Sequence, residues 1–241
     1  MLEKTSGIVL NQIKHTDSGI VVQVFTQKYG RQSYIIKGIR NKKSGKHASF
    51  FRPLTILDLV VYYKESRSMQ SVKEITVEYA PADIYTNVLK SSIAMFISEV
   101  MTSVLREEGQ HEELFDFIKG AIVYLDERKE SFSNFHIAFL AALCSFIGFE
   151  PGRKTDSENR TFDMVNGTFV AIPPSHGVYS DIEVSGILAR FFSSSWDEMN
   201  QISLTGHLRN EVLSELLRYY SVHMPSLKKI NSISILKEVF G

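Results

Sequence analysis

The chain has 241 residues, of which 44% are hydrophobic and 22% charged, so it has enough apolar material for a sizeable core without a metal or a disulfide. Its single cysteine, Cys144, excludes an internal disulfide and a multi-cysteine zinc site. No stretch has the length and apolarity of a signal peptide or a membrane span, so we expect a cytoplasmic protein.

The charges balance over the whole chain but not within it. Lysine and arginine total 27, as do aspartate and glutamate. Residues 1–80 carry 13 basic and 6 acidic side chains, a net charge of +7, whereas residues 81–241 carry 14 and 21, a net charge of −7. Between Lys28 and Leu57 there are eight basic residues and no acidic one. Such a run attracts polyanions, although a solvated loop that keeps a sheet edge soluble has the same composition.

Residues 1–80 are predicted to form strands. Runs rich in β-branched and aromatic residues, separated by turn residues, cover residues 7–10, 20–25, 31–39, 54–63 and 71–79. The stretch 41–49 is polar, contains glycine and has no hydrophobic periodicity, so we expect a loop there. Five short strands in so short a segment favour a small closed barrel over a sandwich. We therefore predict a five-stranded OB-type barrel, whose groove suits single-stranded nucleic acid.

After residue 81 the periodicity becomes helical. Asp83 is predicted to cap a helix whose apolar face begins at Val88 and which ends at Gly109. Further helices are predicted at 114–125, 134–147, 181–192 and 208–220, with a short segment at 233–240; 134–147 should be the buried central helix. Asn166-Gly167 predicts a hairpin between 161–165 and 168–172. The predicted fold is α+β and multidomain: an OB-fold nucleic-acid-binding domain, residues 1–80, followed by a mainly α-helical bundle, residues 81–241, with a small hairpin insertion.

Sequence motifs for catalysis are missing. The stretch from Gly38 to Lys46 lacks the spacing of a phosphate-binding P-loop, and no G-x-S-x-G nucleophile elbow is present. His111 is followed by two glutamates, but Phe115 stands where a zincin motif has its second histidine. We therefore expect no enzyme and no cofactor.

Aromatic residues are interleaved with the basic run. Phe25 and Tyr34 lie on predicted strands and are expected to fill the barrel core. Tyr29, Phe50 and Phe51 flank loops and are the better candidates to stack on bases, at about 1–3 kcal/mol each.

Several stretches, taken in order, resemble the RecO family of bacterial recombination mediators. The similar stretches are 25–31 (FTQKYGR), 36–43 (IKGIRNKK), 51–54 (FRPL) and 57–59 (LDL) in the barrel, and 142–151 (ALCSFIGFEP) and 226–229 (SLKK) in the helical part. The resemblance implies an OB barrel followed by a helical bundle, and a non-catalytic role in recombinational DNA repair. It covers nearly the whole chain.

The resemblance also implies partners. Members of the family bind single- and double-stranded DNA and anneal complementary strands. With their partner RecR they help RecA displace single-strand-binding protein, whose acidic C-terminal tail docks on the mediator. That tail would need a basic pocket in the helical part, for which Arg190, Arg209 and Arg218 are candidates. The implied location is the cytoplasm, in association with the nucleoid.

Carried over to this chain, the resemblance assigns DNA binding to the basic run and its aromatic neighbours. The residues are Lys28, Tyr29, Arg31, Lys37, Arg40, Lys42, Lys43, Lys46, Phe50 and Arg52. Many family members also carry a four-cysteine zinc site after a GF-x-P turn. Residues 150–180 occupy that zinc-finger-like position here without cysteines, so we expect the protein to fold without metal.

Two other functions fit the same charge pattern. One is an RNA-binding OB-fold protein, for example in ribosome maturation, because residues of the barrel groove do not separate DNA from RNA. The other is an adaptor that binds no nucleic acid and whose basic loop is merely exposed.

Overall fold

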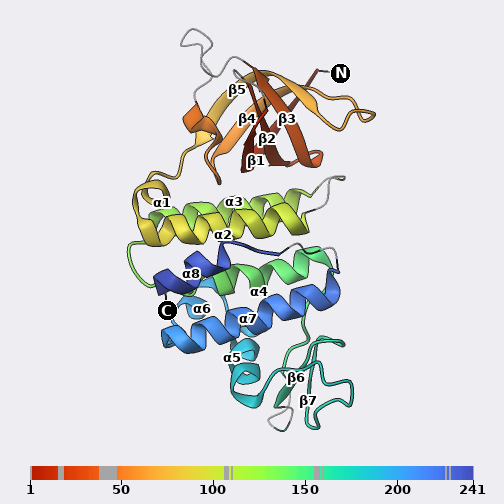
Figure 1. Ribbon diagram of the computed structural model, residues 1–241, viewed down its shortest axis with the longest axis vertical. Helices are drawn as coiled ribbons and strands as arrows, with labels where there is room; N and C mark the ends of the chain where they lie inside the picture. The colour runs from red at the N-terminus through yellow and green to blue at the C-terminus, as the bar shows by residue number, and fades with distance from the viewer. Residues whose placement is uncertain are drawn as a thin grey trace. The chain divides into compact units, whose positions relative to one another are not determined.

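The computed structural model describes residues 2–15, 19–37, 48–105, 109, 111–154, 158, 160–225, 227 and 229–240 (Figure 1). The chain forms two compact units, Met1–Glu127 and Arg128–Gly241. In the described part of the chain, no helix is both long enough and apolar enough to cross a membrane.

Five strands form a closed barrel in the first unit. They are β1 (Leu2–Lys14), β2 (Gly19–Thr26), β3 (Gly30–Lys37), β4 (Ile56–Tyr62) and β5 (Gln70–Tyr79), in the order β1-β2-β3-β5-β4. The long β1 pairs with β4 through its first half and with β2 along most of its length, with a bulge between Val9 and Asn11. β3 and β5 run parallel and share two residue pairs. The predicted five-stranded OB-type barrel is confirmed.

Alternating side chains of the strands fill the barrel interior. Its buried cluster consists of Val9, Val22, Val24, Tyr34, Ile36, Phe51, Leu57, Leu59 and Val61. Burial of each such side chain contributes roughly 1.5–3 kcal/mol before entropy is counted. Position 7 of β1 requires glycine, because a Cβ atom there would lie 2.5 Å from a methyl group of Val24, one of the side chains of this interior.

The helices of the first unit are α1 (Ala82–Thr86), α2 (Val88–Val104) and α3 (Glu112–Glu127). The prediction that Asp83 caps the long helix is wrong. α2 is capped by Asn87, whose side chain accepts hydrogen bonds from the amides of Leu89 and Lys90. Asn87 interrupts the helical run four residues after Asp83, so Asp83 lies in the first turn of the short α1. Val88 is 74% exposed rather than buried, and α2 ends at Val104, before Gly109.

A buried polar network joins these helices to the barrel. The Lys90 side chain is fully buried, and its ammonium forms an ion pair with Asp83 and donates to the carbonyl oxygen of Asp126 at 2.9 Å. The Asp126 carboxylate accepts from the Tyr79 hydroxyl at 2.7 Å and from the Ile84 amide at 2.8 Å. Each buried polar group of this network is therefore paired, which is the condition for keeping charge inside a fold.

The second unit contains α4 (Phe135–Ile147), α5 (Ile182–Ser193), α6 (Trp196–Asn200), α7 (Gly206–His223) and α8 (Ile233–Phe240), with strands β6 (Thr161–Asp163) and β7 (Thr168–Val170). α4 is buried over most of its circumference, as predicted, and Gly148 ends it in a left-handed conformation at φ 93°. Cys144 is buried in α4, and burial raises the pKa of its thiol to about 12. α6 was not predicted.

The hairpin β6–β7 lies at the zinc-finger-like position. The Asp163 carboxylate organises its four-residue loop by accepting from the amides of Val165 and Asn166, at 2.9 and 3.2 Å, and from the Asn166 side chain at 2.7 Å. His176 lies 3.2 Å from the same carboxylate. Burial alone would raise the pKa of Asp163, but the hydrogen bonds from Asn166 and Val165 hold it below its ordinary value. A carboxylate thus crosslinks the loop by hydrogen bonds. Among the described residues, no three His, Cys, Asp or Glu side chains are grouped so as to hold a metal ion.

Candidate nucleic-acid interface

The turn between β2 and β3 holds two of the predicted DNA-binding residues, Lys28 and Tyr29. Thr26 fixes this turn: its hydroxyl donates to the carbonyl oxygen of Gly30 at 2.8 Å and accepts from the Tyr29 amide at 3.0 Å. Gly30 has φ 63°, a left-handed conformation that favours glycine. The Lys28 side chain is exposed, and its ammonium lies 3.8 Å from Glu3. The turn therefore presents a cation and an aromatic ring on a rigid backbone.

The Tyr29 ring stacks on Tyr63, which directly follows β4. The ring centroids are 3.8 Å apart and the planes differ by 13°. Tyr63 in turn packs against the barrel interior, which contains the buried Tyr34. We call Tyr29 and Tyr63 the tyrosine pair. The sequence analysis missed Tyr63, because its partner lies 34 positions earlier in the chain and no local pattern links them.

Two further predicted cations lie on β3. Arg31 is half-buried and pairs in register with Phe25 of β2, while Lys37 is exposed at the end of the strand. The expectation that Phe25 and Tyr34 belong to the core is confirmed, since they are 0% and 1% exposed. The structure thus places Lys28, Arg31 and Lys37 along one turn and strand.

The short 3-10 helix η2 (Ala48–Phe51) precedes β4 and carries two of the stacking candidates. The prediction for Phe51 is wrong: its side chain is 1% exposed and inserts into the barrel interior, because the chain must close the barrel end here. Phe50 is half-buried and packs against the same interior, so only part of its ring is exposed for stacking on a base. Proximity to a polar loop was therefore a poor guide to exposure.

Arg52 has contacts of its own within the first unit. Its guanidinium carbon lies 3.7 Å from the centre of the Tyr85 ring, a cation–π contact, and Nη2 is 3.4 Å from the Tyr85 carbonyl oxygen. Two residues on, Leu54 adopts a left-handed backbone at φ 66° and donates its amide to the Val9 carbonyl. Arg52 therefore combines an exposed charge with a role in anchoring η2 beside α1.

The other four predicted DNA-binding residues lie outside the described residues. They are Arg40, Lys42, Lys43 and Lys46. Their assignment rests on the sequence.

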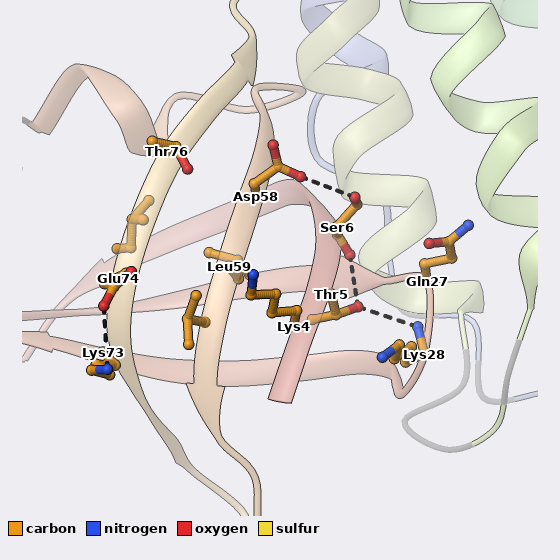
Figure 2. A pocket seen from close by; sticks show the side chains of 12 residues that line it. Lys4, Thr5, Ser6, Gln27, Lys28, Asp58, Leu59, Lys73, Glu74 and Thr76 are labelled. Atoms are coloured by element: carbon orange, nitrogen blue, oxygen red, sulfur yellow. Dashed lines mark hydrogen bonds and ion pairs between the residues drawn. The ribbon is translucent and has the colours of Figure 1, made fainter. Parts of the chain in front are cut away.

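A hollow of about 760 Å³, which we call the barrel groove, lies on the outside of β1, β4 and β5 (Figure 2). Figure 2 shows Lys4 reaching across its middle, with Lys28 on one side and Lys73 on the other. Of its acidic groups, Asp58 accepts from the Ser6 hydroxyl at 3.2 Å and Glu74 pairs with Lys73 at 3.3 Å. Lys4 and Lys73 were missed because they stand apart from the basic run. The groove adds cations next to the turn that carries Lys28.

The three arginines suggested as a binding site for an acidic tail differ in their contacts within the structure. The Arg209 guanidinium donates to the Asn134 side chain at 2.9 Å and to the carbonyl oxygens of Leu204 and Phe240 at 3.0 and 3.2 Å. Arg218 donates to two backbone carbonyls of the segment after the hairpin, at 3.3 and 3.4 Å. Arg190 is exposed near the end of α5. Arg209 and Arg218 therefore hold the fold together, and Arg190 remains available.

Comparison with known proteins finds the same family along the whole chain. The family model described as Recombination protein O N terminal matches residues 1–80, and that described as Recombination protein O C terminal matches residues 86–230. A protein named DNA repair protein RecO from Azobacteroides pseudotrichonymphae is 33% identical over 240 residues, and one of the same name from Phocaeicola vulgatus is 32% identical over 241 residues, with 100% of each chain covered. The one from Flavobacterium psychrophilum is 31% identical over 240 residues, with 99% of each chain covered.

Proposed function

The chain belongs to the RecO family of DNA repair proteins, and from this premise we propose that it is a non-enzymatic recombination mediator. In this proposal it binds single- and double-stranded DNA and anneals complementary strands. It also helps RecA load onto DNA that is coated with single-strand-binding protein.

The observation that carries the proposal is the arrangement of cations on the barrel. Lys28 and Lys37 are exposed on a turn and a strand of an OB-type barrel, and Lys4 and Lys73 line the adjoining groove. Lysine and arginine gain affinity for DNA mainly by neutralising phosphates and releasing counterions. Phosphates carry no sequence information, so such a surface suits a protein that must act on any strand. We assign to this surface the ten residues from Lys28 to Arg52 that were predicted from the sequence, and we take residues 1–80 as the DNA-binding domain.

We further propose that RecR and the acidic tail of single-strand-binding protein are partners, and that RecA is reached indirectly. The helical part, residues 81–241, is the proposed site for the tail. Because Arg209 and Arg218 are engaged with backbone carbonyls, Arg190 is the arginine of the three that supports this interaction best. The proposed location is the cytoplasm, in association with the nucleoid.

The test is annealing of two complementary DNA strands, each coated with single-strand-binding protein. We expect the protein to accelerate annealing without added nucleotide, to leave both strands intact, and to lose activity steeply as salt rises. Parallel reactions with RNA strands separate this function from that of an RNA-binding barrel. Salt-independent behaviour with no acceleration on DNA would contradict the proposal.

A further inference from the structure

We propose that the tyrosine pair is a clamp that takes one base of single-stranded DNA between the rings of Tyr29 and Tyr63, where the Tyr34 hydroxyl hydrogen-bonds the inserted base. This inference rests on the proposed function, because it specifies how the barrel holds a base once the phosphates are bound. It adds Tyr63 and Tyr34 to the site.

The first step is the geometry of the pair. Aromatic pairs in proteins prefer offset or edge-to-face arrangements, with centroids about 4.5–7 Å apart, over a face-to-face sandwich. The centroid distance of 3.8 Å is shorter than this range and the planes differ by only 13°, so the two rings form a close, nearly parallel stack. A heteroaromatic base between the rings would replace this one stacking contact by two. Each stacked base contributes about 1–3 kcal/mol in single-strand-binding proteins.

The second step is that the rings can separate without damage to the sheet. Tyr29 belongs to the turn between β2 and β3, and Tyr63 lies just beyond the end of β4. Neither residue is part of a paired strand register. Rotation about side-chain bonds, which also breaks the hydrogen bond between the Tyr29 and Glu3 side chains, is then enough to admit a base, while the hydrogen bonds of Thr26 hold the turn in place.

The third step is the buried hydroxyl of Tyr34. It has no hydrogen-bond partner in the described part of the protein, although the side chain is 1% exposed. Burial, and then the neighbouring Tyr29 and Tyr63, raise the pKa of Tyr34, so the hydroxyl keeps its proton and can donate it in a hydrogen bond. Buried polar groups are nearly always paired, and an orphan costs about 1–3 kcal/mol. The polar edge of a base held by the clamp would supply the missing partner.

The fourth step is the charge beside the clamp. Lys28 directly precedes Tyr29 and is exposed, with a weak ion pair to Glu3 at 3.8 Å. A phosphate next to the inserted base would compete with Glu3 for this ammonium. Two consecutive residues of one turn would then stack on the base and neutralise its phosphate.

The experiment measures affinity for two single-stranded oligonucleotides of equal length, one ordinary and one that keeps the sugar-phosphate chain but lacks bases. We expect the Tyr29→Ala and Tyr63→Ala variants to bind the ordinary strand roughly 5- to 150-fold more weakly, the equivalent of one stacked base. Their salt dependence should be unchanged because no phosphate contact is lost. On the strand without bases, the variants and the unmodified protein should bind alike. Tyr62→Ala is the matched control, since Tyr62 directly precedes Tyr63 in the chain and is 49% exposed.

Tyr34→Phe separates the clamp from a purely structural role. Removing an orphan hydroxyl from the barrel should leave the thermal unfolding midpoint unchanged or higher. Affinity for the ordinary strand should nevertheless fall by about 2- to 10-fold, the value of one neutral hydrogen bond.

Each outcome decides between the proposals. If the unmodified protein binds neither strand, the proposed function and the clamp both fail. If it binds both strands equally well, or if the tyrosine variants bind the ordinary strand like the unmodified protein, the clamp alone is wrong. The comparison of the two strands uses the unmodified protein, so it remains decisive even if a variant does not fold.

Discussion

The barrel and the helical parts of the molecule use their charged side chains differently. On the barrel, Lys4, Lys28 and Lys37 are exposed, and the ion pair of Lys28 spans 3.8 Å. In the helical parts, Lys90 is fully buried in a network around Asp126, and Arg209 donates three hydrogen bonds to other elements. The same residue types are therefore exposed in one region and tied into the fold in the other.

This difference shows why a net charge is an incomplete guide to function. The counts of +7 for residues 1–80 and −7 for the rest include charges that are tied inside the protein and cannot meet a ligand. What matters for DNA is the set of cations that can exchange their present neighbours for phosphates. The comparison predicts large stability effects for the buried charges of the helical parts and small ones for solvated charges.

The largest expected effect is at Lys90. In a Lys90→Ala variant, the Asp126 carbonyl and the Asp83 carboxylate lose their buried partner. We expect a loss of about 3 kcal/mol in the free energy of unfolding, at the low end for a broken buried pair because Asp83 is 34% exposed and reaches water. Chemical denaturation measures it.

Lys119 gives the matched control in the same unit, because its ion pair with Glu78 is at the surface. Lys119→Ala should change stability by less than about 1 kcal/mol. Equal effects at both lysines would contradict the division between buried and solvated charges.

The next effect is at Asp163 in the hairpin. Its carboxylate is 4% exposed and accepts three hydrogen bonds from the loop of β6–β7. Asp163→Ala should therefore cost roughly 1.5–3 kcal/mol, since two backbone amides and the Asn166 side chain lose a charged acceptor. His176→Ala, which removes one partially exposed neighbour, should cost less. Hydrogen exchange of the hairpin amides distinguishes local opening of the hairpin from unfolding of the whole unit. Unchanged exchange rates after Asp163→Ala would show that other contacts hold the hairpin.

A smaller effect, dependent on pH, is expected at His136. Burial, and then the positive charge of Arg209, lower the pKa of this side chain to about 3. The unfolded chain binds a proton below about pH 6.5, whereas the folded chain does not, so stability is complete above pH 6.5 and decreases as the pH falls toward 3. The loss should be about 2 kcal/mol at pH 5. Denaturation of the unmodified protein and of His136→Leu at pH 7 and pH 5 measures it: the variant should lose this part of the pH dependence, and identical curves would refute the assignment.

Much of the fold was predictable because it depends on local patterns. The strands alternate β-branched residues, and Gly148 marks a helix end that needs a left-handed residue. The short helix α6 was missed, although Ser195 and Glu198 form a capping box with the spacing S-x-x-E. The cap at Asp83 was wrong since Asn87, four residues later, caps the longer helix. Helix boundaries depend on such competition between neighbouring caps.

The site was less predictable, because it depends on contacts between distant positions. Tyr29 and Tyr63 meet only once the barrel closes. Phe50 and Phe51 are adjacent and both lie within the basic run, yet Phe51 is buried in the barrel and Phe50 is half-buried. The pairing of β1 with β4 and of β4 with β5 brings Lys4 near Lys73, and the pairing of β1 with β2 places the turn that carries Lys28 beside them. The charge run indicates the barrel as the candidate site, and the topology determines which of the described cations lie side by side.

The smallest stability effect and a large binding effect are expected for Lys42, Lys43 and Lys46. No acidic residue lies between Lys28 and Leu57, so these lysines have no nearby partner in the sequence. Replacing all three by Ala should leave the thermal midpoint nearly unchanged. Each lost phosphate contact lowers the slope of log affinity against log salt by roughly 0.7 for single strands, so three contacts remove about 2. The loss should depend little on base sequence, because phosphates carry none.

The control for this variant changes the same net charge elsewhere. Lys129, Lys154 and Lys229 are exposed in the second unit, and replacing these three by Ala alters the long-range field of the protein by the same amount. If the slope falls by about 2 only when Lys42, Lys43 and Lys46 are removed, those lysines contact phosphates directly. If both triple variants bind with the slope of the unmodified protein, Lys42, Lys43 and Lys46 only keep the barrel soluble, and DNA binding then depends on Lys28, Lys37 and the groove. A further variant, Lys4→Ala with Lys73→Ala, would measure that contribution, and its slope should fall by roughly 1.4 for two phosphate contacts.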